Sequence, residues 1–535
     1  MMGVVKQKLS ENAKVIIPSA LQTAYCTSNS HAYIVTSIPG TYSINFHNGC
    51  QHNEILALYN RHLIDRSYIA FDKKYWKIQS LKVTRSWVFK PDTITYKDVA
   101  MSYQGGKRRV YMRARENLLL DGLRKSDGYI KMFVKPDRYS TETVHDKMPR
   151  AIQYRSPKFN MELATFLKPY EHHFYAHPGL GPSGTRVVTK GLNPTELADL
   201  FILKSAQFRN PIYVSLDHSK FDSTVREEHL KTEHNQYMRA FPHKRGKLYG
   251  LLRQQLLNRG FTRNGIKYSI RGTRMSGDYN TGLGNCLLNR IVLESWLMSI
   301  KHEIMLDGDD SVVIIEADDF DKLDTTHFTR MGFETKIDYT CDMTEVVYCQ
   351  KRIVLAHEPV MVRDPLRALS NMALCLANVQ SAGILKWLRG VIYGEYMVNF
   401  NMPIYCAFEE FLDGKIIKTH ELREKIAGVA VRRHTKVERY AFEQTWGIPD
   451  GVQLHLEQTI KTHFHSLFTT DSKYVNNKND DAKEKQESYR PATGSTSLSA
   501  LHTSANQSWD EHSTQRIQHR PNAFCVTPIT ATAPG

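Results

Sequence analysis

Three short segments, and their order along the chain, constrain this chain more than any other feature. They are SLDHSKFDSTV at 215–225, RMSGDYNTGLGNCLLN at 274–289 and IMLDGDDSVVIIE at 304–316. The first and third place carboxylates at strand ends or turns, and the middle one supplies small hydroxyl, amide and glycine residues. Two-metal phosphoryl transfer needs carboxylates that converge on ions roughly 3.5–4 Å apart. The order of the segments therefore favours a fold that gathers acidic strand ends around a nucleotide.

The third segment contains two adjacent carboxylates, Asp309 and Asp310, directly after Gly308. Apolar residues on both sides predict a strand, a tight turn and a second strand. Adjacent like charges between two buried strands are costly unless cations neutralise them. This favours a metal site over the alternative of a plain acidic turn. Because the ligands are oxygen only, Mg²⁺ or Mn²⁺ fits better than zinc.

The first segment places Asp217 at the end of an apolar strand and Asp222 five residues further on. Asp217 would project from the strand tip and could bind metal, whereas Asp222 would sit further back and could read a sugar hydroxyl. In the middle segment, the hydroxyl and amide groups of residues 276–285 could hydrogen-bond a ribose and a template backbone. Taken singly, the aspartate spacing is also expected by chance, and the loop is also an ordinary helix start.

A basic block, IKMFVKPDRYSTETVHDKMPRAIQYRSPKFNMELATFLKP, runs through residues 130–169. Residues 133–134 and 151–154 read as two strands. Cations on strands joined by a polar connection could line a channel for a triphosphate or a template, and the alternative is an ordinary solvated hairpin. The cations are Lys131, Lys135, Arg138, Lys147, Arg150, Arg155 and Lys158.

The rest of the chain predicts a mixed α+β architecture. We expect helices near 225–239, 245–258 and 285–300, a hairpin at Asn264-Gly265, strands near 330–337 and 346–354, and a mostly helical stretch over 364–464 that breaks at Pro403 and near Gly447. Residues 471–535 are polar and poor in aliphatic side chains, which predicts a disordered tail.

Charge and cysteine content narrow the class of protein. The 71 Lys and Arg residues outnumber the 55 Asp and Glu residues by 16, which fits nucleic acid as a partner, although an anionic membrane surface or a plain basic surface also fits. The eight cysteines form no Cys-x-x-Cys pair and read as reduced thiols in a cytosolic compartment. We find no apolar run of transmembrane length and no secretory signal.

Several histidines invite a zinc interpretation, but no cysteines accompany them at suitable spacing. We therefore expect packed or exposed histidines rather than zinc ligands. They are His172, His173 and His177 beside Glu171, and His455, His463 and His465.

Taken together, these segments resemble the RNA-dependent RNA polymerases of positive-strand RNA viruses, most of all the tombusvirus-like group, with nodavirus-like and flavivirus-like enzymes as more distant relatives. The resemblance covers residues 125–375 and extends weakly to 460. It rests on DHSKFD at 217–222, SGDYNTGLGN at 276–285, DGDD at 307–310 and the basic block as a triphosphate-entry motif. YCQKR at 348–352 resembles the primer-grip hairpin, and Gly332-Phe333 with Lys336 resembles the motif of a general-acid lysine.

The resemblance implies roles for individual residues. Asp217 and Asp309 would bind two Mg²⁺ or Mn²⁺ ions, with Asp310 as an accessory ligand. Asp222 and Asn285 would recognise the ribose 2′-hydroxyl, with Ser276 and Thr281 in support. The triphosphate would contact Lys135, Lys147, Arg150 and Arg155, and Lys336 would protonate the leaving pyrophosphate unless it is only a surface residue.

The resemblance also implies a right-hand fold of fingers, palm and thumb. We expect an N-terminal region and fingers at 1–210, the first palm motif at 211–225, a fingers insertion at 226–275, the rest of the palm at 276–363, the thumb at 364–470 and the tail at 471–535. Two departures from the family pattern stand out. About 125 residues precede the basic block where relatives carry a long membrane-targeting region, and Tyr279 occupies a position where methionine is expected.

The expected partners are an RNA template and product, NTPs and other viral or host replication proteins. We expect the host cytoplasm, at membrane-associated replication complexes, with peripheral rather than transmembrane attachment. Two other functions stay open. A reverse transcriptase shares the palm, although it usually blocks the 2′-hydroxyl with a bulky side chain where this chain has Asp222 and Asn285. An RNA-binding scaffold with a decayed polymerase fold would not need Asp217, Asp309 and Asp310.

Overall fold

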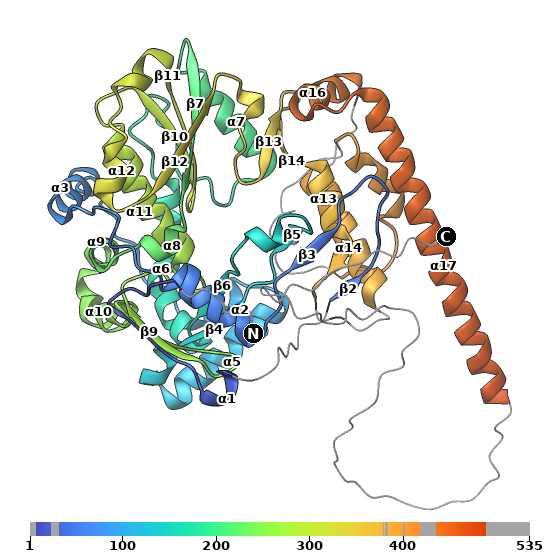
Figure 1. Ribbon diagram of the computed structural model, residues 1–535, viewed down its shortest axis with the longest axis horizontal. Helices are drawn as coiled ribbons and strands as arrows, with labels where there is room; N and C mark the ends of the chain where they lie inside the picture. Colours follow the sequence, from blue (N-terminus) through green and yellow to red (C-terminus); the bar gives the residue numbers. More distant parts are fainter. Residues whose placement is uncertain are drawn as a thin grey trace, which may run out of the picture.

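The computed structural model describes residues 7–22, 32–377, 379, 383–399, 402–417 and 435–487. Figure 1 shows a four-stranded sheet at the upper left, a five-stranded sheet at the lower left and a C-terminal helical region at the right. In the described part of the chain, no helix is both long enough and apolar enough to cross a membrane.

The four-stranded sheet is antiparallel throughout and has the order β10-β11-β7-β12. Its strands are β7 (Pro211–His218), β10 (His302–Asp307), β11 (Asp310–Glu316) and β12 (Thr335–Thr340). Apolar side chains of β7, β10 and β11 are buried on both faces. Val214 and Val313 belong to the large core cluster that includes helix α11 (Thr281–Trp296), whereas Tyr213 and Val312 belong to the cluster that includes α7 (Pro194–Ser205). Both faces of these three strands are therefore covered and their ends stay open, whereas β12, at the edge of the sheet, is partly exposed.

The five-stranded sheet has the order β1-β9-β8-β4-β6 and differs in burial. Its strands are β1 (Ala13–Ile16), β4 (Ile130–Val134), β6 (Ala151–Tyr154), β8 (Leu257–Thr262) and β9 (Lys267–Arg271). Strands β4 and β8 alternate between buried and exposed residues, as expected of a sheet with one solvated face. Its buried face packs on α2 (Gln51–Ala57), where Met132 and Ile55 share one core cluster.

The other helices surround these sheets. They are α1 (Ser19–Gln22), α3 (Lys73–Thr84), α4 (Tyr96–Met101), α5 (Gly105–Asp121), α6 (Pro157–Ala176), α8 (Phe221–Thr224), α9 (Glu227–Ala240), α10 (Arg245–Leu252) and α12 (Thr326–Met331). Helix α2 continues as one turn of π-helix over Leu58–His62. Helix α6 is long and buries Phe159, Phe166 and Phe174.

Two short strand pairs join the N-terminal segment to the rest of the molecule. Strand β3 (Ile44–Phe46) pairs with β5 (Arg138–Ser140), and β2 (Tyr33–Ile34) pairs with β15 (Leu374–Cys375). The Arg138 guanidinium also donates to the Leu374 carbonyl oxygen, with an Nη2–O distance of 2.8 Å. Residues 33–46 therefore connect the region of the five-stranded sheet to the C-terminal helical region, and β3 lies between them in Figure 1.

The C-terminal helical region follows the β13 (Lys351–Val354) and β14 (Val360–Arg363) hairpin. It comprises α13 (Pro365–Met372), α14 (Ile384–Val398), a 3₁₀ segment (Tyr405–Phe411), α16 (Lys436–Trp446) and α17 (Asp450–Glu487). Leu388, Phe408, Phe442 and Phe464 pack in its core. Helix α16 ends at Gly447, which adopts a left-handed conformation, so the predicted break is confirmed.

Most predicted elements are present, but several boundaries were wrong. The strand expected over 330–337 begins only at Thr335, because Thr326–Met331 forms helix α12. The helix expected over 245–258 ends at Leu252, because Leu257 already begins strand β8. Of the stretch expected as a strand over 346–354, only β13 (Lys351–Val354) is strand. Helix α17 continues to Glu487, so residues 471–487 of the predicted disordered tail are helical. A polar stretch that contains Ala482, Lys483 and Glu484 cannot form a core but has good helix propensity. Residues 488–535 lie outside the described residues.

Candidate active site

A row of charged residues crosses the open end of the four-stranded sheet. Asp307 of β10 pairs with Asp310 of β11, and Lys336 of β12 pairs with Asp217 of β7. Ser311 of β11 pairs with Leu216 of β7, so Asp310 and Asp217 are the next residues in the same register. Residues opposite one another on neighbouring strands project from the same face. The row therefore reads Asp307, Asp310, Asp217 and Lys336.

Asp309 lies beside this row in the two-residue turn between β10 and β11. Gly308 occupies the first turn position with a φ of 75°, a conformation that glycine adopts readily and that tight hairpins require. The Asn289 side chain of α11 donates to the carbonyl oxygens of Gly308 and Asp309, each at 3.2 Å. The turn is thus fixed from below by α11, and Asp309 stays exposed.

The carboxylates of the row influence one another. Although the Asp310 side chain reaches solvent, partial loss of hydration raises its pKa to about 6, and the charges of Asp309, Asp307 and Asp217 add to the shift. Such a carboxyl holds its proton to higher pH, and a bound cation would favour the ionised form. The donors are all oxygen, which suits Mg²⁺ or Mn²⁺. In the described residues, however, no three Asp, Glu, His or Cys side chains already surround a common ion position.

A hydrogen-bonded chain of side chains joins the first and second sequence segments. The Asn285 Nδ2 donates to Asp222 Oδ1 at 2.8 Å, and Arg274 Nε donates to Asn285 Oδ1 at 3.0 Å. Arg274 in turn forms a buried ion pair with Glu233 of α9. A Cβ at Gly284 would collide with this ion pair, so glycine here lets α11 approach it. These hydrogen bonds orient the Asp222 and Asn285 side chains relative to one another.

Asp222 also belongs to the electrostatic environment of the carboxylate turn. Burial raises its pKa, the hydrogen bond from Asn285 opposes the shift, and the charge of Asp309 adds to it. The positive charges of Arg274 and Arg150 act in the opposite direction. The structure thus brings the Asp222–Asn285 pair, the carboxylate turn and one cation of the basic block into one region.

The cations of the basic block lie in two different environments, one near Asp137 and one in the protein core. Lys135 Nζ and Arg150 Nη1 both contact Asp137, at 2.9 and 3.5 Å. Lys147 is exposed on the connection between β5 and β6. Arg61, which the sequence did not suggest, joins them. Burial lowers its pKa, the Arg150 charge adds to that shift and Asp222 opposes it.

Arg155 does not join this group. Its guanidinium is fully buried and donates to Asp278 Oδ1 at 2.7 Å, and further to the Gly128 carbonyl and to Asn258. We therefore place Arg155 in the core below the five-stranded sheet rather than in the triphosphate group. A lysine or arginine in a basic block is normally solvated, and this one is buried because three acceptors from distant segments enclose it.

Ser276 and Thr281 hydrogen-bond to backbone. Ser276 Oγ donates to Ala151 O at 2.6 Å, and Thr281 Oγ1 donates to the carbonyl oxygens of Met275 and Asp278 at 2.8 and 2.9 Å. Both hydroxyls therefore shape the loop that leads into α11 and fasten it to β6. Their predicted support of ribose recognition would be indirect.

Lys336 is opposite Asp217 in register but is largely exposed, and its Nζ contacts Asp338 Oδ2 at 2.5 Å. The histidines lie elsewhere. His173 and His177 pack against Phe89, and His465 contacts Glu410 at 3.0 Å. Lys336 thus remains the candidate for a general acid, near Asp217 but not yet directed to it.

Sequence reasoning missed four contributors, namely Arg61, Lys190, Glu233 and Arg274. Lys190 forms an ion pair with Asp307, a residue that lies 117 positions away. Arg274 begins the segment RMSGDYNTGLGN and was therefore visible, but nothing local distinguishes it from other arginines. Asp307 was visible as the first residue of DGDD, although no role was predicted for it.

Comparisons with known proteins identify the family of this chain. A family model described as viral RNA dependent RNA polymerase matches residues 19–463. The RNA-directed RNA polymerase of Carnation mottle virus is 33% identical over 391 residues, which cover 69% of this chain and 51% of that protein. That of Tobacco necrosis virus (strain A) is 32% identical over 410 residues, which cover 72% and 56%. The Turnip crinkle virus protein is 34% identical over 299 residues, which cover 54% and 38%. The chain spans about half the length of the first two relatives.

Proposed function

From the premise that this chain belongs to the viral RNA-dependent RNA polymerase family, we propose that it replicates a positive-strand viral RNA genome from NTPs. One observation carries the proposal. Asp310 and Asp217 stand side by side at the open end of a sheet, with Asp309 in the adjoining turn and the Asp222–Asn285 pair in the same region. Such an arrangement offers carboxylates to cations and an amide–carboxylate pair to a sugar.

The proposed reaction is nucleotidyl transfer. The 3′-hydroxyl of the growing RNA attacks the α-phosphate of an NTP, a new P–O bond forms, the bond between the α- and β-phosphates breaks and pyrophosphate leaves. Asp217 and Asp309, with Asp310 as accessory ligand, would hold two Mg²⁺ or Mn²⁺ ions. When bound, such ions activate the attacking oxygen and neutralise the phosphate charge. The protein otherwise positions the reactants.

Asp222 and Asn285 would read the ribose 2′-hydroxyl. Asn285 already uses one amide hydrogen on Asp222 and its oxygen on Arg274, which leaves its second hydrogen and the other Asp222 oxygen for the sugar. A site that pairs with a hydroxyl discriminates against a substrate that lacks it. This supports RNA rather than DNA synthesis, so we favour the polymerase over a reverse transcriptase.

We assign the triphosphate to Lys135, Lys147, Arg150 and Arg61, and the protonation of pyrophosphate to Lys336. Support comes from position. The charge of Arg150 lowers the pKa of Asp222, and the charge of Asp222 raises the pKa of Arg61. Lys336 is the cross-strand neighbour of Asp217.

The regions fit a right hand. The four-stranded sheet would be the palm, because its strands fall inside residues 211–225 and 276–363. The five-stranded sheet would be the fingers, since β8 and β9 of the 226–275 insertion join β1, β4 and β6 of the first 210 residues. The helices from α13 to α17 would be the thumb.

The exposed face of the five-stranded sheet would guide the RNA strand. Lys131 is opposite both Tyr154 and Phe261, and Phe261 is opposite Lys267. In the described part of the chain, neither Lys131 nor Lys267 forms an ion pair. Alternating aromatic rings and cations suit single-stranded nucleic acid, because bases stack on rings and phosphates meet the charges.

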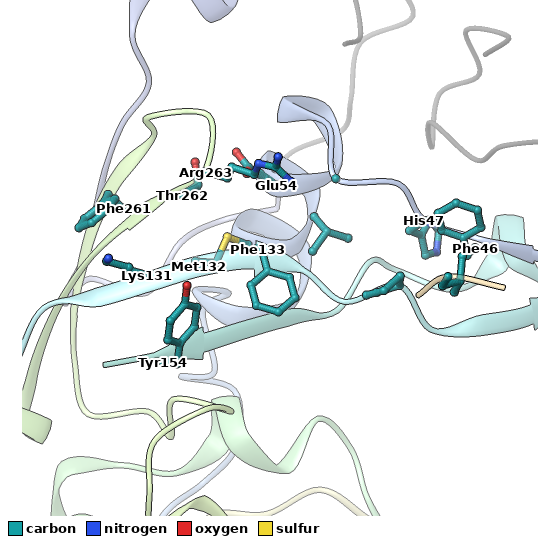
Figure 2. Close-up of a pocket in the computed structure, with 14 residues that line it drawn as sticks. Phe46, His47, Glu54, Lys131, Met132, Phe133, Tyr154, Phe261, Thr262 and Arg263 are labelled. Atoms are coloured by element: carbon teal, nitrogen blue, oxygen red, sulfur yellow. The ribbon is translucent and has the colours of Figure 1, made fainter. Parts of the chain in front are cut away.

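A cavity of about 510 Å³ lies along this row, because Tyr154, Lys131 and Phe261 all line it. Figure 2 shows Phe261 and Lys131 at one end of the cavity, Phe46 and His47 at the other, and Phe133 between them. Its size and aromatic lining fit one unstacked base of the RNA strand.

The site of action would be the host cytoplasm, at membrane-associated replication complexes, with other replication proteins and peripheral membrane attachment as further proposals.

The test is template-directed synthesis. Purified protein is given a short RNA template–primer of defined sequence, Mg²⁺ or Mn²⁺ and one labelled NTP or dNTP at a time. We expect extension only with the NTP that complements the next template base, weak extension with the matching dNTP and none after chelation. Equal use of dNTP would favour a reverse transcriptase. Tight RNA binding with no extension would favour the scaffold.

A further inference from the structure

The segment before α7 lies along the open edge of β10. Val188 forms a parallel bridge with Leu306. The backbone N–H of Thr189 donates to Leu306 O at 2.9 Å, and that of Leu306 donates to Val187 O at 3.0 Å. Residues 187–189, which we call the edge strand, therefore lie along the edge of β10 through an isolated parallel bridge. This edge strand brings Lys190 level with Asp307, at the same end as the carboxylate row.

Lys190 is held there from two further directions. Its aliphatic stem passes Gly282 at the start of α11, where a Cβ would already be 3.3 Å from Lys190 Cε. The hydroxyl of Thr189 bonds to that of Tyr348 at 2.7 Å, which ties the segment to the turn before β13. The Lys190 Nζ donates to Asp307 Oδ1, and both side chains are about one-third exposed.

The carboxylates of the row thus differ in whether they have an ion-pair partner. Asp307 has a cation partner, whereas in the described part of the chain no Lys, Arg or His lies within ion-pair distance of Asp217 or Asp310. Asp307 is nevertheless the direct cross-strand neighbour of Asp310. Without its partner it would be a further carboxylate beside the cation ligands, and carboxylates that flex toward a cation readily join its ligands.

We propose that Lys190 is a positioning residue that holds the Asp307 carboxylate away from the cations, so that Asp217, Asp309 and Asp310 alone determine where the ions bind. This inference rests on the proposed nucleotidyl transfer. It separates the DGDD motif into one structural aspartate and two ligands. It also gives the segment before α7 an indirect role, through the position of Asp307.

The test is a double-mutant cycle of Lys190→Gln, Asp307→Asn and the combined variant. Two readouts are taken, Mn²⁺ binding followed by the electron paramagnetic resonance of the free ion, and NTP incorporation as a function of Mg²⁺. We expect Lys190→Gln to bind Mn²⁺ about tenfold more tightly and to turn over about tenfold more slowly, because Asp307 now competes for the ions. In the combined variant, the added Asp307→Asn change should return both values toward wild type. Lys190→Arg alone should leave both values at the wild-type level.

A matched control is available on the same strand. Lys204 pairs with Glu303 at 2.6 Å at the other end of β10, where both side chains are buried. Lys204→Gln should lower the unfolding temperature without tightening Mn²⁺ binding. If Lys190→Gln weakens Mn²⁺ binding as a merely damaged fold would, or if the combined variant is no better than Lys190→Gln, the inference is wrong. Mn²⁺ binding answers this even if the wild type extends no primer, which would count against the proposed function alone.

Discussion

The two sheets of this molecule each align side chains of neighbouring strands into a row, but the two rows differ in charge and in position. In each, antiparallel pairing aligns residues of neighbouring strands into a row. The row of the four-stranded sheet is acidic and lies at the strand ends, because helices cover both faces. The row of the five-stranded sheet alternates Tyr154, Lys131, Phe261 and Lys267 across an exposed face. Burial thus decides which side chains of a sheet can meet a ligand. A sheet covered on both faces exposes side chains at its strand ends, whereas a sheet covered on one face exposes a row across the other face.

Under the proposed function, the acidic row would carry the chemistry and the aromatic and cationic row would bind RNA. A change in the acidic row should remove turnover and leave RNA affinity intact, whereas a change in the aromatic and cationic row should do the reverse. Four variants test this division of roles, and we expect the greatest loss from the first.

Asp217→Asn should lower the rate of NTP incorporation at saturating RNA by more than about 100-fold, since even groups that only orient metal ligands can cost that much. RNA affinity should stay within twofold of wild type, as measured by fluorescence anisotropy of a labelled strand. Ser215→Ala, two residues earlier on the same strand, is the control. A comparable loss in that control would point to damage of the sheet.

Asp222→Ala should narrow the preference for NTP over dNTP by about 10- to 100-fold, because a hydrogen bond to a charged group is lost. The measurement is kcat/KM for the matching NTP and dNTP on one template. Asn285→Ala should act in the same direction, since the two side chains form one hydrogen-bonded pair. Unchanged discrimination in both variants would remove the pair from sugar recognition.

Phe261→Ala should weaken single-stranded RNA binding by about tenfold, the loss expected for one stacked base, with little change of turnover once RNA is saturating. Tyr440→Ala is a matched control, because that ring is exposed on α16. Equal losses in the two variants would mean that the five-stranded sheet has no special part in RNA binding.

Lys131→Gln should have the smallest effect at low salt and a diagnostic one across salt concentrations. Losing one phosphate contact on a single strand should reduce the slope of log affinity against log salt by about 0.7. Anisotropy titrations at several salt concentrations measure it. A slope equal to that of wild type would show that Lys131 does not meet a phosphate.

Local patterns in the sequence predicted the carboxylate turn well. The strand–turn–strand character of residues 304–316 is visible in the apolar runs on either side of Gly308, and the hairpin forms as expected. The Asn264-Gly265 hairpin is likewise present between β8 and β9. These features depend on neighbours in sequence, and pattern reasoning captures such neighbours.

Other features depend on contacts between distant segments and could not be predicted. Arg155 reads as one more cation of a basic block, yet acceptors from three segments bury it. The pairing of Lys190 with Asp307 needs an edge strand that only the tertiary fold supplies. The aromatic and cationic row requires β4 to pair in parallel with β8, more than a hundred residues later.

The most direct test of the account compares wild type with Asp309→Asn on pre-formed complexes with one template–primer, followed after addition of Mg²⁺ and the matching NTP. The account predicts that both proteins hold the RNA equally well and that only the wild type extends it. Extension by Asp309→Asn at a rate close to that of wild type would contradict the claim that the acidic end of the four-stranded sheet is the catalytic centre. Loss of RNA binding together with activity would contradict the separation of the two sheets.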